Sequence, residues 1–180
     1  MRKLFVGLSL LFVLSTQYAT ADFLIEPFAG YETGNIKDNN SSGEADYKGM
    51  AYGLRLGVKM LGLGVGAEYA GGALETDQTP AAKYSFKNMG AFISYDFPVM
   101  VRAYMTYFFA ADTDIDVTPT ATLKGSGYRV GLGFTSFPFM TINVEYLVRN
   151  WDEAEQGGTK TSLDYTSKTT MLSLAFPLSF

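Results

Sequence analysis

The stretch MAYGLRLGVKM, residues 50–60, places unlike side chains at alternate positions. One face is apolar and consists of Met50, Tyr52, Leu54, Leu56 and Val58. The other face is small or basic and consists of Ala51, Gly53, Arg55, Gly57 and Lys59. A repeat of two residues is the repeat of a β-strand whose faces meet different surroundings. The stretch therefore predicts a strand with an apolar face and a polar face.

Segments of this kind recur along the chain and predict eight strands. Their approximate ranges are 23–34, 47–60, 63–74, 84–96, 100–110, 125–135, 139–150 and 164–180. Tight turns at 61–62, 97–99 and 136–138 alternate with long polar stretches at 35–46, 75–83, 111–124 and 151–163. Alternation of short turns and long loops is typical of membrane barrels. We therefore expect an all-β fold, an eight-stranded antiparallel transmembrane up-and-down β-barrel.

The apolar faces of these segments carry no charge, whereas the opposite faces carry acidic and basic residues among many glycines. In a barrel that spans a membrane, the apolar faces meet lipid and the charges pair inside the lumen. The residues expected to form these interior ion pairs are Glu26, Arg55, Glu68, Asp96, Arg102, Arg129 and Glu145. A two-residue loop would place Arg55 opposite Glu68, and a three-residue loop would place Arg129 opposite Glu145. Arg102 is expected to lie diagonal to Asp96.

Aromatic residues near the ends of the segments are expected to form two girdles at the membrane surfaces, where amphipathic rings prefer to lie. The set near the long loops is Tyr31, Tyr52, Tyr69, Tyr107, Tyr128 and Tyr146. The set near the short turns is Tyr95, Phe97, Phe134 and Phe180. Pro27 and Pro177 fall in the first and last strands, so we expect a local bulge or a frayed rim where those strands meet.

The N-terminal segment has the order of a cleaved secretory signal. Arg2 and Lys3 precede an apolar run at 4–14, and Ala19-Thr20-Ala21 provides the small residues of a cleavage site. The run is shorter than the roughly 20 residues that a membrane helix needs. We therefore expect residues 1–21 to be a signal peptide cleaved after Ala21, and residues 22–180 to be one barrel domain in the bacterial outer membrane.

Composition excludes several classes of function. The chain has no His and no Cys, so it lacks an imidazole base, a Ser-His-Asp triad, a thiolate metal site and a disulfide framework. Without Arg2 and Lys3, 12 of its 14 basic residues remain against 18 acidic ones, which argues against a nucleic-acid partner. The acidic stretch 112–116 lacks the glycine and glutamate of an EF-hand. We expect no enzymatic activity, cofactor or metal.

The two ends of the mature chain resemble small OmpA-like outer-membrane barrels. The first strand, LIEPFAGY at 24–31, is similar to their opening strand, and the ending LSLAFPLSF at 172–180 resembles their terminal strand signal. The resemblance implies handling by the barrel-assembly machinery. The residues of this C-terminal assembly signal are Leu174, Phe176, Leu178 and Phe180.

The leading hypothesis for function is a non-enzymatic outer-membrane barrel that gives structural support and displays surface loops. The interior charges are expected to form a structural plug, and the alternative is a gate whose ion pairs exchange to open a thin conductive path. The second hypothesis is a narrow pore or a conduit for small solutes or apolar molecules, as in OmpW-like barrels. A third is a periplasmic ligand-binding barrel, which needs the apolar face inside. The expected partners are outer-membrane lipids, including lipopolysaccharide, and the expected state is a monomer, because a closed barrel has no free edge.

Overall fold

A computed structural model describes residues 21–40, 43–77, 83–115, 121–137 and 139–180. Its strands are β1 (Asp22–Asp38), β2 (Glu44–Met60), β3 (Leu63–Thr76), β4 (Lys83–Phe97), β5 (Val101–Ile115), β6 (Ala121–Phe137), β7 (Met140–Gln156), β8 (Thr159–Ala175) and β9 (Leu178–Ser179). No helix among the described residues is long and apolar enough to cross a membrane. The expected signal segment lies outside the described residues, except for Ala21.

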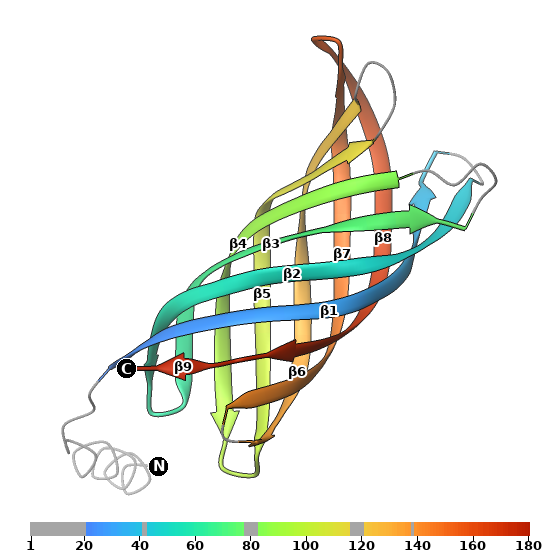
Figure 1. The fold of residues 1–180 in the computed structure, drawn as a ribbon. Coiled ribbons are helices and arrows are strands. Elements are labelled where there is room, and N and C mark those ends of the chain that lie inside the picture. The colour runs from blue at the N-terminus through green and yellow to red at the C-terminus, as the bar shows by residue number, and fades with distance from the viewer. Residues whose placement is uncertain (1–20, 41–42, 78–82, 116–120, 138) are drawn as a thin grey trace, which may run out of the picture.

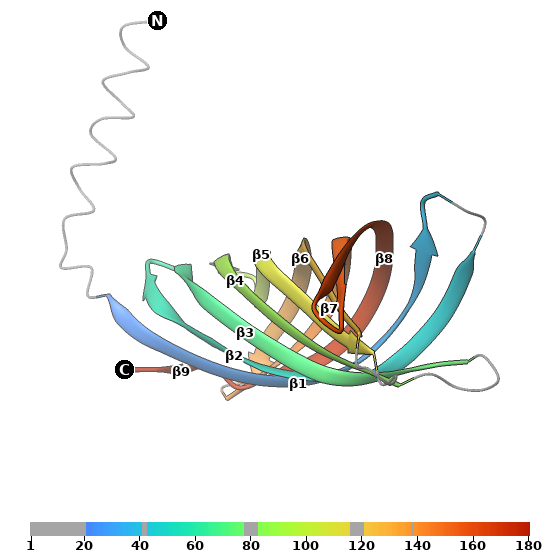
Figure 2. The ribbon, with the colours of Figure 1, turned by 90° about the horizontal axis from the view of Figure 1, so that it is seen from above.

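The first strand closes the sheet into a barrel. β1 pairs with β2 on one side and with β8 and β9 on the other, while the remaining strands pair with their neighbours in sequence. All these pairings are antiparallel. Figure 1 shows the strands running obliquely to the long direction of the barrel. Figure 2 shows the wall that they form curving from β1 round to β8. Because β9 continues the line of β8, the predicted eight-stranded antiparallel barrel is confirmed.

Both ends of the barrel chain lie at the end of the wall that carries the tight turns, which we call the short-turn end (Figure 1). Here Phe23 and Phe180 exchange backbone hydrogen bonds of 2.9 and 3.1 Å. Leu61 and Gly62 have φ angles of 52° and 83°, so both turn residues are left-handed, as a type I′ hairpin requires. The predicted two-residue loop at 61–62 is confirmed. The opposite end, with the long hairpins, is called the long-hairpin end.

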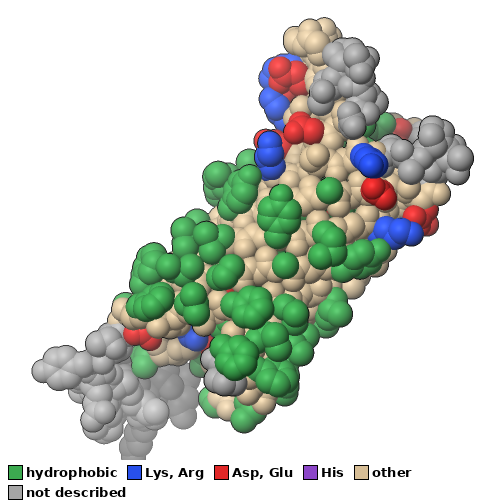
Figure 3. All heavy atoms as spheres, viewed as in Figure 1, with side chains coloured by type: hydrophobic (Ala, Val, Ile, Leu, Met, Phe, Trp, Pro, Cys, Tyr) green, Lys and Arg blue, Asp and Glu red, His purple; other side chains and the backbone are tan. Residues whose placement is uncertain are grey.

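The wall is apolar outside and charged inside. Leu132, Val144 and Leu172 expose 61, 59 and 59% of their surface, although they lie within paired strands. The six tyrosines of the set expected near the long loops are exposed as well. Figure 3 shows hydrophobic side chains over the middle and lower wall, and charged side chains toward the long-hairpin end. The predicted sidedness, with apolar side chains outside and ion pairs within, is confirmed.

Glycines make room for the large side chains that fill the lumen. A Cβ atom added to Gly131 would lie 2.3 Å from Cζ of Tyr104, and one added to Gly53 would lie 2.4 Å from Cζ of Phe28. Both distances are well inside van der Waals contact, so an alanine at either position would displace a ring. Glycine on the inner face therefore lets a narrow barrel hold aromatic and guanidinium groups together.

The predicted long loops are wrong in extent, because strands occupy most of them. β5 runs to Ile115 and β6 begins at Ala121, where a loop at 111–124 was expected. β7 and β8 are joined only by Gly157 and Gly158, with φ angles of 58° and 82°. The belt of exposed apolar side chains on the outer wall is called the apolar band. Beyond it, toward the long-hairpin end, both faces of a hairpin meet water, so the chain needs no apolar alternation there. Backbone pairing continues without that pattern.

The predicted register between β6 and β7 is also wrong. Arg129 lies opposite Leu147, and Glu145 lies opposite Gly131, a shift of two residues from the expected pairing. The cause is the turn, since β6 continues to Phe137 and pairs there with Met140, with an irregularity after Phe134. Position 138 of the expected three-residue turn lies outside the described residues. The even shift keeps both charged side chains on the inner face.

The two prolines of the closing strands meet as expected. β8 ends at Ala175 and β9 resumes at Leu178, so the break falls at Phe176 and Pro177. The backbone N–H of Phe176 donates to the carbonyl of Pro27 at 2.9 Å, so one ladder bond survives beside the break. The predicted local irregularity at this seam is confirmed, and the sheet closes across it.

Candidate functional site: an ion-pair network inside the barrel

The seven side chains predicted to lie inside the barrel come from seven successive strands, β1 to β7. In strand order they are Glu26, Arg55, Glu68, Asp96, Arg102, Arg129 and Glu145. Six of them are buried, and Asp96 lies at the short-turn end with 21% of its side chain exposed. Period two places each of these residues on the inner face, because every one falls on the parity opposite to the lipid-facing residues of its strand.

Arg55 lies at the centre of the network. Its Nη1 donates to Glu26 at 2.7 Å and its Nε donates to Glu68 at 2.9 Å. Its Nη2 lies 3.8 Å from a carboxylate oxygen of Glu145, which is an ion pair without a hydrogen bond. Arg55 and Glu68 face each other in the β2–β3 ladder, as the sequence predicted. Glu26 faces Arg55 across the β1–β2 ladder, so one guanidinium joins three strands directly.

Glu68 joins two arginines. It accepts hydrogen bonds from Arg55, from Nη1 of Arg129 at 2.5 Å and from the hydroxyl of Thr106 at 2.7 Å. Nε of Arg129 also lies 3.0 Å from Glu145, at an angle unsuitable for a hydrogen bond. The predicted association of Arg129 with Glu145 is therefore present as a diagonal ion pair, despite the shifted register.

The network continues to the short-turn end through Arg102. Its Nε donates to Asp96 at 2.5 Å, and its Nη1 donates to Glu26. Asp96 also pairs with Lys59. Arg102 lies directly opposite Asp96 in the β4–β5 ladder, so the expected diagonal placement is wrong. The reason is the turn: pairing closes at Phe97 opposite Val101, which leaves three residues between the strands.

The connected charges balance. Four cations, Arg55, Lys59, Arg102 and Arg129, meet four carboxylates, Glu26, Glu68, Asp96 and Glu145. A neutral and densely paired set is the arrangement in which charges can remain inside a narrow barrel, because each ion replaces water with an opposite charge.

Aromatic rings cover the network on the side toward the long-hairpin end. Cζ of Arg55 lies 4.5 Å from the ring centre of Phe28 and 4.3 Å from that of Tyr104. Cζ of Arg129 lies 5.2 Å from Phe28 and 5.3 Å from Phe108. These distances are those of cation–π contacts. The rings therefore pack against the guanidinium groups of the network.

Sequence reasoning missed a second ion pair, between Arg149 of β7 and Glu32 of β1. Nη2 of Arg149 donates to both carboxylate oxygens of Glu32 at 3.2 and 3.1 Å, and its Cζ lies 4.7 Å from the ring centre of Phe86. Leu147 and Met171 are completely buried in the lumen and belong to its apolar layer. The available signal was parity, since Glu32 lies six residues after Glu26 on the same face of one strand.

The residues of the expected assembly signal form a stripe on the outer wall at the short-turn end. Leu174, Phe176, Leu178 and Phe180 expose 42, 41, 46 and 75% of their surface. They follow the outward parity of β8 across the break into β9. They form an outward-facing apolar stripe on the last strand.

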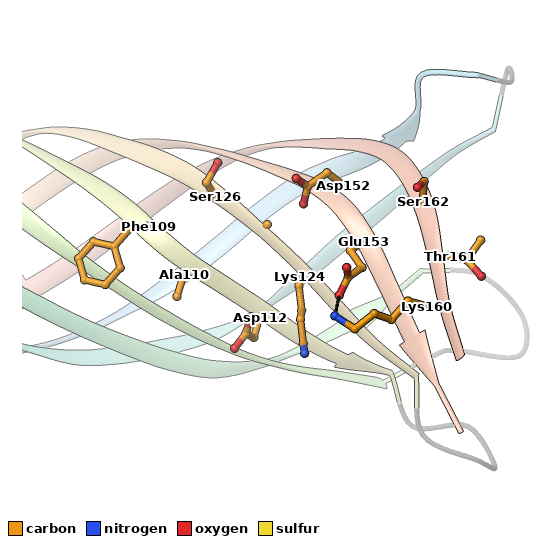
Figure 4. A pocket seen from close by; sticks show the side chains of 11 residues that line it. Phe109, Ala110, Asp112, Lys124, Ser126, Asp152, Glu153, Lys160, Thr161 and Ser162 are labelled. Atoms are coloured by element: carbon orange, nitrogen blue, oxygen red, sulfur yellow. Dashed lines mark hydrogen bonds and ion pairs between the residues drawn. The ribbon is translucent and has the colours of Figure 1, made fainter. Parts of the chain in front are cut away.

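The outer wall has a polar hollow toward the long-hairpin end of β5, β6, β7 and β8 (Figure 4). It has a volume of about 510 Å³ and is lined by Asp112, Lys124, Asp152 and neighbouring residues. Lys160 and Glu153 form an ion pair of 2.9 Å beside it. In this part of the wall, the ladder between β5 and β6 is interrupted between Phe108 and Thr113. The described residues contain no group of three His, Cys, Asp or Glu side chains placed to hold a metal.

Comparison with known proteins identifies the fold. No protein-family model matches the chain, and no curated protein matches its sequence. Among solved structures, the chain is similar to Neisserial surface protein A, with a TM-score of 0.57 and 14% identity over 87% of this chain and 98% of the other. It is also similar to Ail, the attachment invasion locus protein of Yersinia pestis, solved with the heparin analogue sucrose octasulfate. That match has a TM-score of 0.59 and 14% identity over 87% of this chain and 99% of the other.

These two neighbours are outer-membrane barrels, so the chain has the fold of a small outer-membrane barrel. Sequence identity of 14% supports a shared fold and no shared function.

Proposed function

We propose that this protein is a sealed, non-enzymatic outer-membrane barrel that anchors long polar hairpins at the cell surface. The observation that carries the proposal is the neutral ion-pair network, which joins seven strands across the lumen. Arg129 and Glu68 have completely buried side chains at its centre. A lumen filled in this way stabilises the wall, because opening it would leave several charges without partners.

The long hairpins are the part of the barrel that the proposal places at the cell surface. The β5–β6 and β7–β8 hairpins extend beyond the apolar band of the wall, and their outer faces carry Lys124, Glu153, Glu155 and Lys160. Backbone pairing reaches Ile115 opposite Ala121 in one hairpin and Gln156 opposite Thr159 in the other. We propose contact with the outer-leaflet surface, including lipopolysaccharide, and with the surroundings of the cell as their role.

The route to the membrane forms part of the proposal. Residues 1–21 are proposed to be a signal peptide cleaved after Ala21. Leu174, Phe176, Leu178 and Phe180 are proposed to be the signal read by the barrel-assembly machinery, and their outward stripe supports this role. The proposed state is a monomer, supported by pairing of β1 on both edges. In a cell-fractionation experiment, we expect the chain in the outer membrane, with heat-modifiable migration on a gel.

Planar-bilayer recording tests whether the lumen is sealed. We expect the wild-type protein to give no current steps, whereas Arg55→Ala combined with Glu68→Ala should admit water and give small steps. The matched control is Lys83→Ala combined with Glu75→Ala, which removes an exposed ion pair from the outside of β3 and β4 and should stay silent. Unboiled gels would show that each variant is folded.

The alternative is an OmpW-like narrow pore or conduit for small solutes or apolar molecules. It requires a path through the network, and ion pairs that exchange partners would provide a gate. Current steps from the wild-type protein would favour this alternative and contradict the sealed anchor.

A further inference from the structure

The lumen has an apolar pocket at the long-hairpin end, above the Arg149–Glu32 pair. Its walls come from seven strands, β1 to β7, and include Ile36, Leu74, Tyr84, Phe86 and Leu123. Leu74 and Phe86 belong to the apolar core cluster, and Ile36 and Tyr84 pack against it. The pocket is a blind one, because Arg149 and Phe86 stack at 4.7 Å where it meets the rest of the lumen.

Three buried polar groups line this pocket without a hydrogen-bond partner among the described residues. They are Nε1 of Trp151, Nε of Arg149 and Oγ1 of Thr113. These residues expose only 4, 1 and 5% of their surface. An indole N–H and a guanidinium Nε–H can only donate, and the threonine hydroxyl can donate or accept. A buried donor without a partner destabilises the fold, so the pocket is suited to receive an acceptor.

The size of the pocket limits what that acceptor can be. The inner cavity has a volume of about 20 Å³, enough for one water-sized group. It adjoins an outer hollow of about 420 Å³, which shares Ile36, Tyr84 and Leu123 with it. A single oxygen atom fits the inner part, and an alkyl chain fits the outer part between the apolar walls.

The charges around the pocket favour a neutral molecule. Arg149 is already neutralised by Glu32 in a two-pronged contact. The rim of the outer hollow carries Asp38 and Glu44, which would repel an anion. A carboxylate would therefore meet repulsion at the rim and find no free positive charge at the bottom.

From these observations we propose that the long-hairpin mouth of the barrel binds a small neutral amphiphile with one hydrogen-bond acceptor, such as a medium-chain ketone, alcohol or ester. Its oxygen accepts hydrogen bonds from Trp151, Arg149 and the hydroxyl of Thr113, and its chain lies against Ile36, Tyr84 and Leu123. The inference goes beyond the anchoring role, because a blind pocket above the ion-pair network neither needs nor opens a path through it.

The sole tryptophan of the chain is Trp151, so its indole N–H gives one cross-peak in a ¹⁵N–¹H spectrum. We would record that peak with the mature protein in phosphatidylcholine nanodiscs while adding 2-undecanone. The expected result is a saturable downfield shift, because the indole N–H gains an acceptor. Undecane has the same chain without an acceptor and should give no such shift. Undecanoate should bind at least ten times more weakly than the ketone, because of the acidic rim.

Two substitutions probe the two parts of the pocket. Thr113→Val keeps the shape and removes the hydroxyl, so the ketone should bind about threefold to tenfold more weakly, the ratio expected for one neutral hydrogen bond. Leu74→Phe should fill the cavity and abolish the saturable shift. The matched control is Thr141→Val, which removes another buried threonine hydroxyl at the short-turn end and should bind as the wild type does.

The proposal is overturned if all three probes shift the peak equally and without saturation, since that would report partition into the lipid alone. It is also overturned if the ketone binds Thr113→Val and Leu74→Phe as it binds the wild type, or if the indole stays unshifted because water already fills the cavity. Unboiled gels check folding, and Thr113→Val decides the matter if Leu74→Phe does not fold. Silence in planar bilayers would leave each of these outcomes unchanged, so the anchoring role and the pocket fail separately.

Discussion

Nη2 of Arg149 lies 3.2 and 3.1 Å from the two carboxylate oxygens of Glu32, although β7 and β1 are not neighbours in the sheet. The pair crosses over β8 inside the lumen. Both residues expose 1% or less of their surface. The contact therefore exists only once the barrel is closed, and it couples closure to the burial of two charges.

Replacement of Arg149 alone should destabilise the barrel strongly. In Arg149→Met, Glu32 keeps its buried position and loses its counter-ion, so we expect the free energy of unfolding to fall by about 3–5 kcal/mol. The double variant Arg149→Met with Glu32→Gln removes both charges and should recover most of that loss. Urea unfolding in lipid vesicles measures all three. Equal stability of the single and double variants would contradict a buried pair.

This pair also shows which part of the site sequence reasoning could not reach. Arg55 and Glu68 were predictable because a two-residue turn fixes the register of adjacent strands. No turn connects β1 to β7, so turn geometry gives no register for Glu32 and Arg149. Parity is compatible with an inward position for each residue, but only the closed barrel sets which strands face each other across the lumen.

Sidedness makes a prediction about the outer wall. Val144 lies midway along the apolar face of β7 with 59% exposure. Val144→Arg should lower the free energy of unfolding in lipid vesicles by about 2–4 kcal/mol, the cost of a charge at the middle of a bilayer. Ser162→Arg, on the β7–β8 hairpin above the apolar band, is the matched control and should change stability little. A small effect of both substitutions would argue that the wall does not meet lipid.

Strand number and sidedness could be predicted because lipid on one side and charge on the other impose a period of two. This alternation of apolar and polar faces ends on β6, where the outward-facing Tyr128 is followed toward the hairpin by the polar Ser126 and Lys124. Beyond that point, pairing of Ala121 to Lys124 with β7 continues without an apolar stripe. Sequence reasoning ended the strands where the pattern ended, although the hydrogen bonds continued.

The contribution of the surface ion pair between Lys124 and Glu155 should depend measurably on pH. The hydrogen bond of 2.7 Å from Lys124, together with its charge, holds the pKa of Glu155 below its ordinary value. The pair therefore contributes at pH values above the ordinary glutamate pKa and is lost as the pH falls through the lowered pKa. In a ¹³C NMR titration, Lys124→Met should raise the pKa of Glu155 toward its ordinary value. Lys160→Met should raise it less, because Lys160 pairs with Glu153.

The final prediction concerns the wall between β5 and β6, where the polar hollow of Figure 4 lies. Their ladder stops at Phe108 opposite Gly127 and resumes at Thr113 opposite Leu123. Backbone groups without strand partners in lipid would be very costly, whereas at the level of lipid headgroups water can satisfy them. Residues 109–112 mark that level, since Phe109 ends the apolar face and Asp112 follows it.

We therefore expect faster amide hydrogen exchange in peptides covering 109–112 and 124–126 than in peptides covering 103–108, in the same lipid sample. The uninterrupted β7–β8 ladder from Thr141 to Trp151 is the internal control and should exchange slowly along its whole length. Protection depends on backbone hydrogen bonds that must break before exchange occurs, so an interrupted ladder lowers the cost of opening. Equal protection at 103–108 and 109–112 would mean that the interruption is bridged, and that water does not enter the wall at this level.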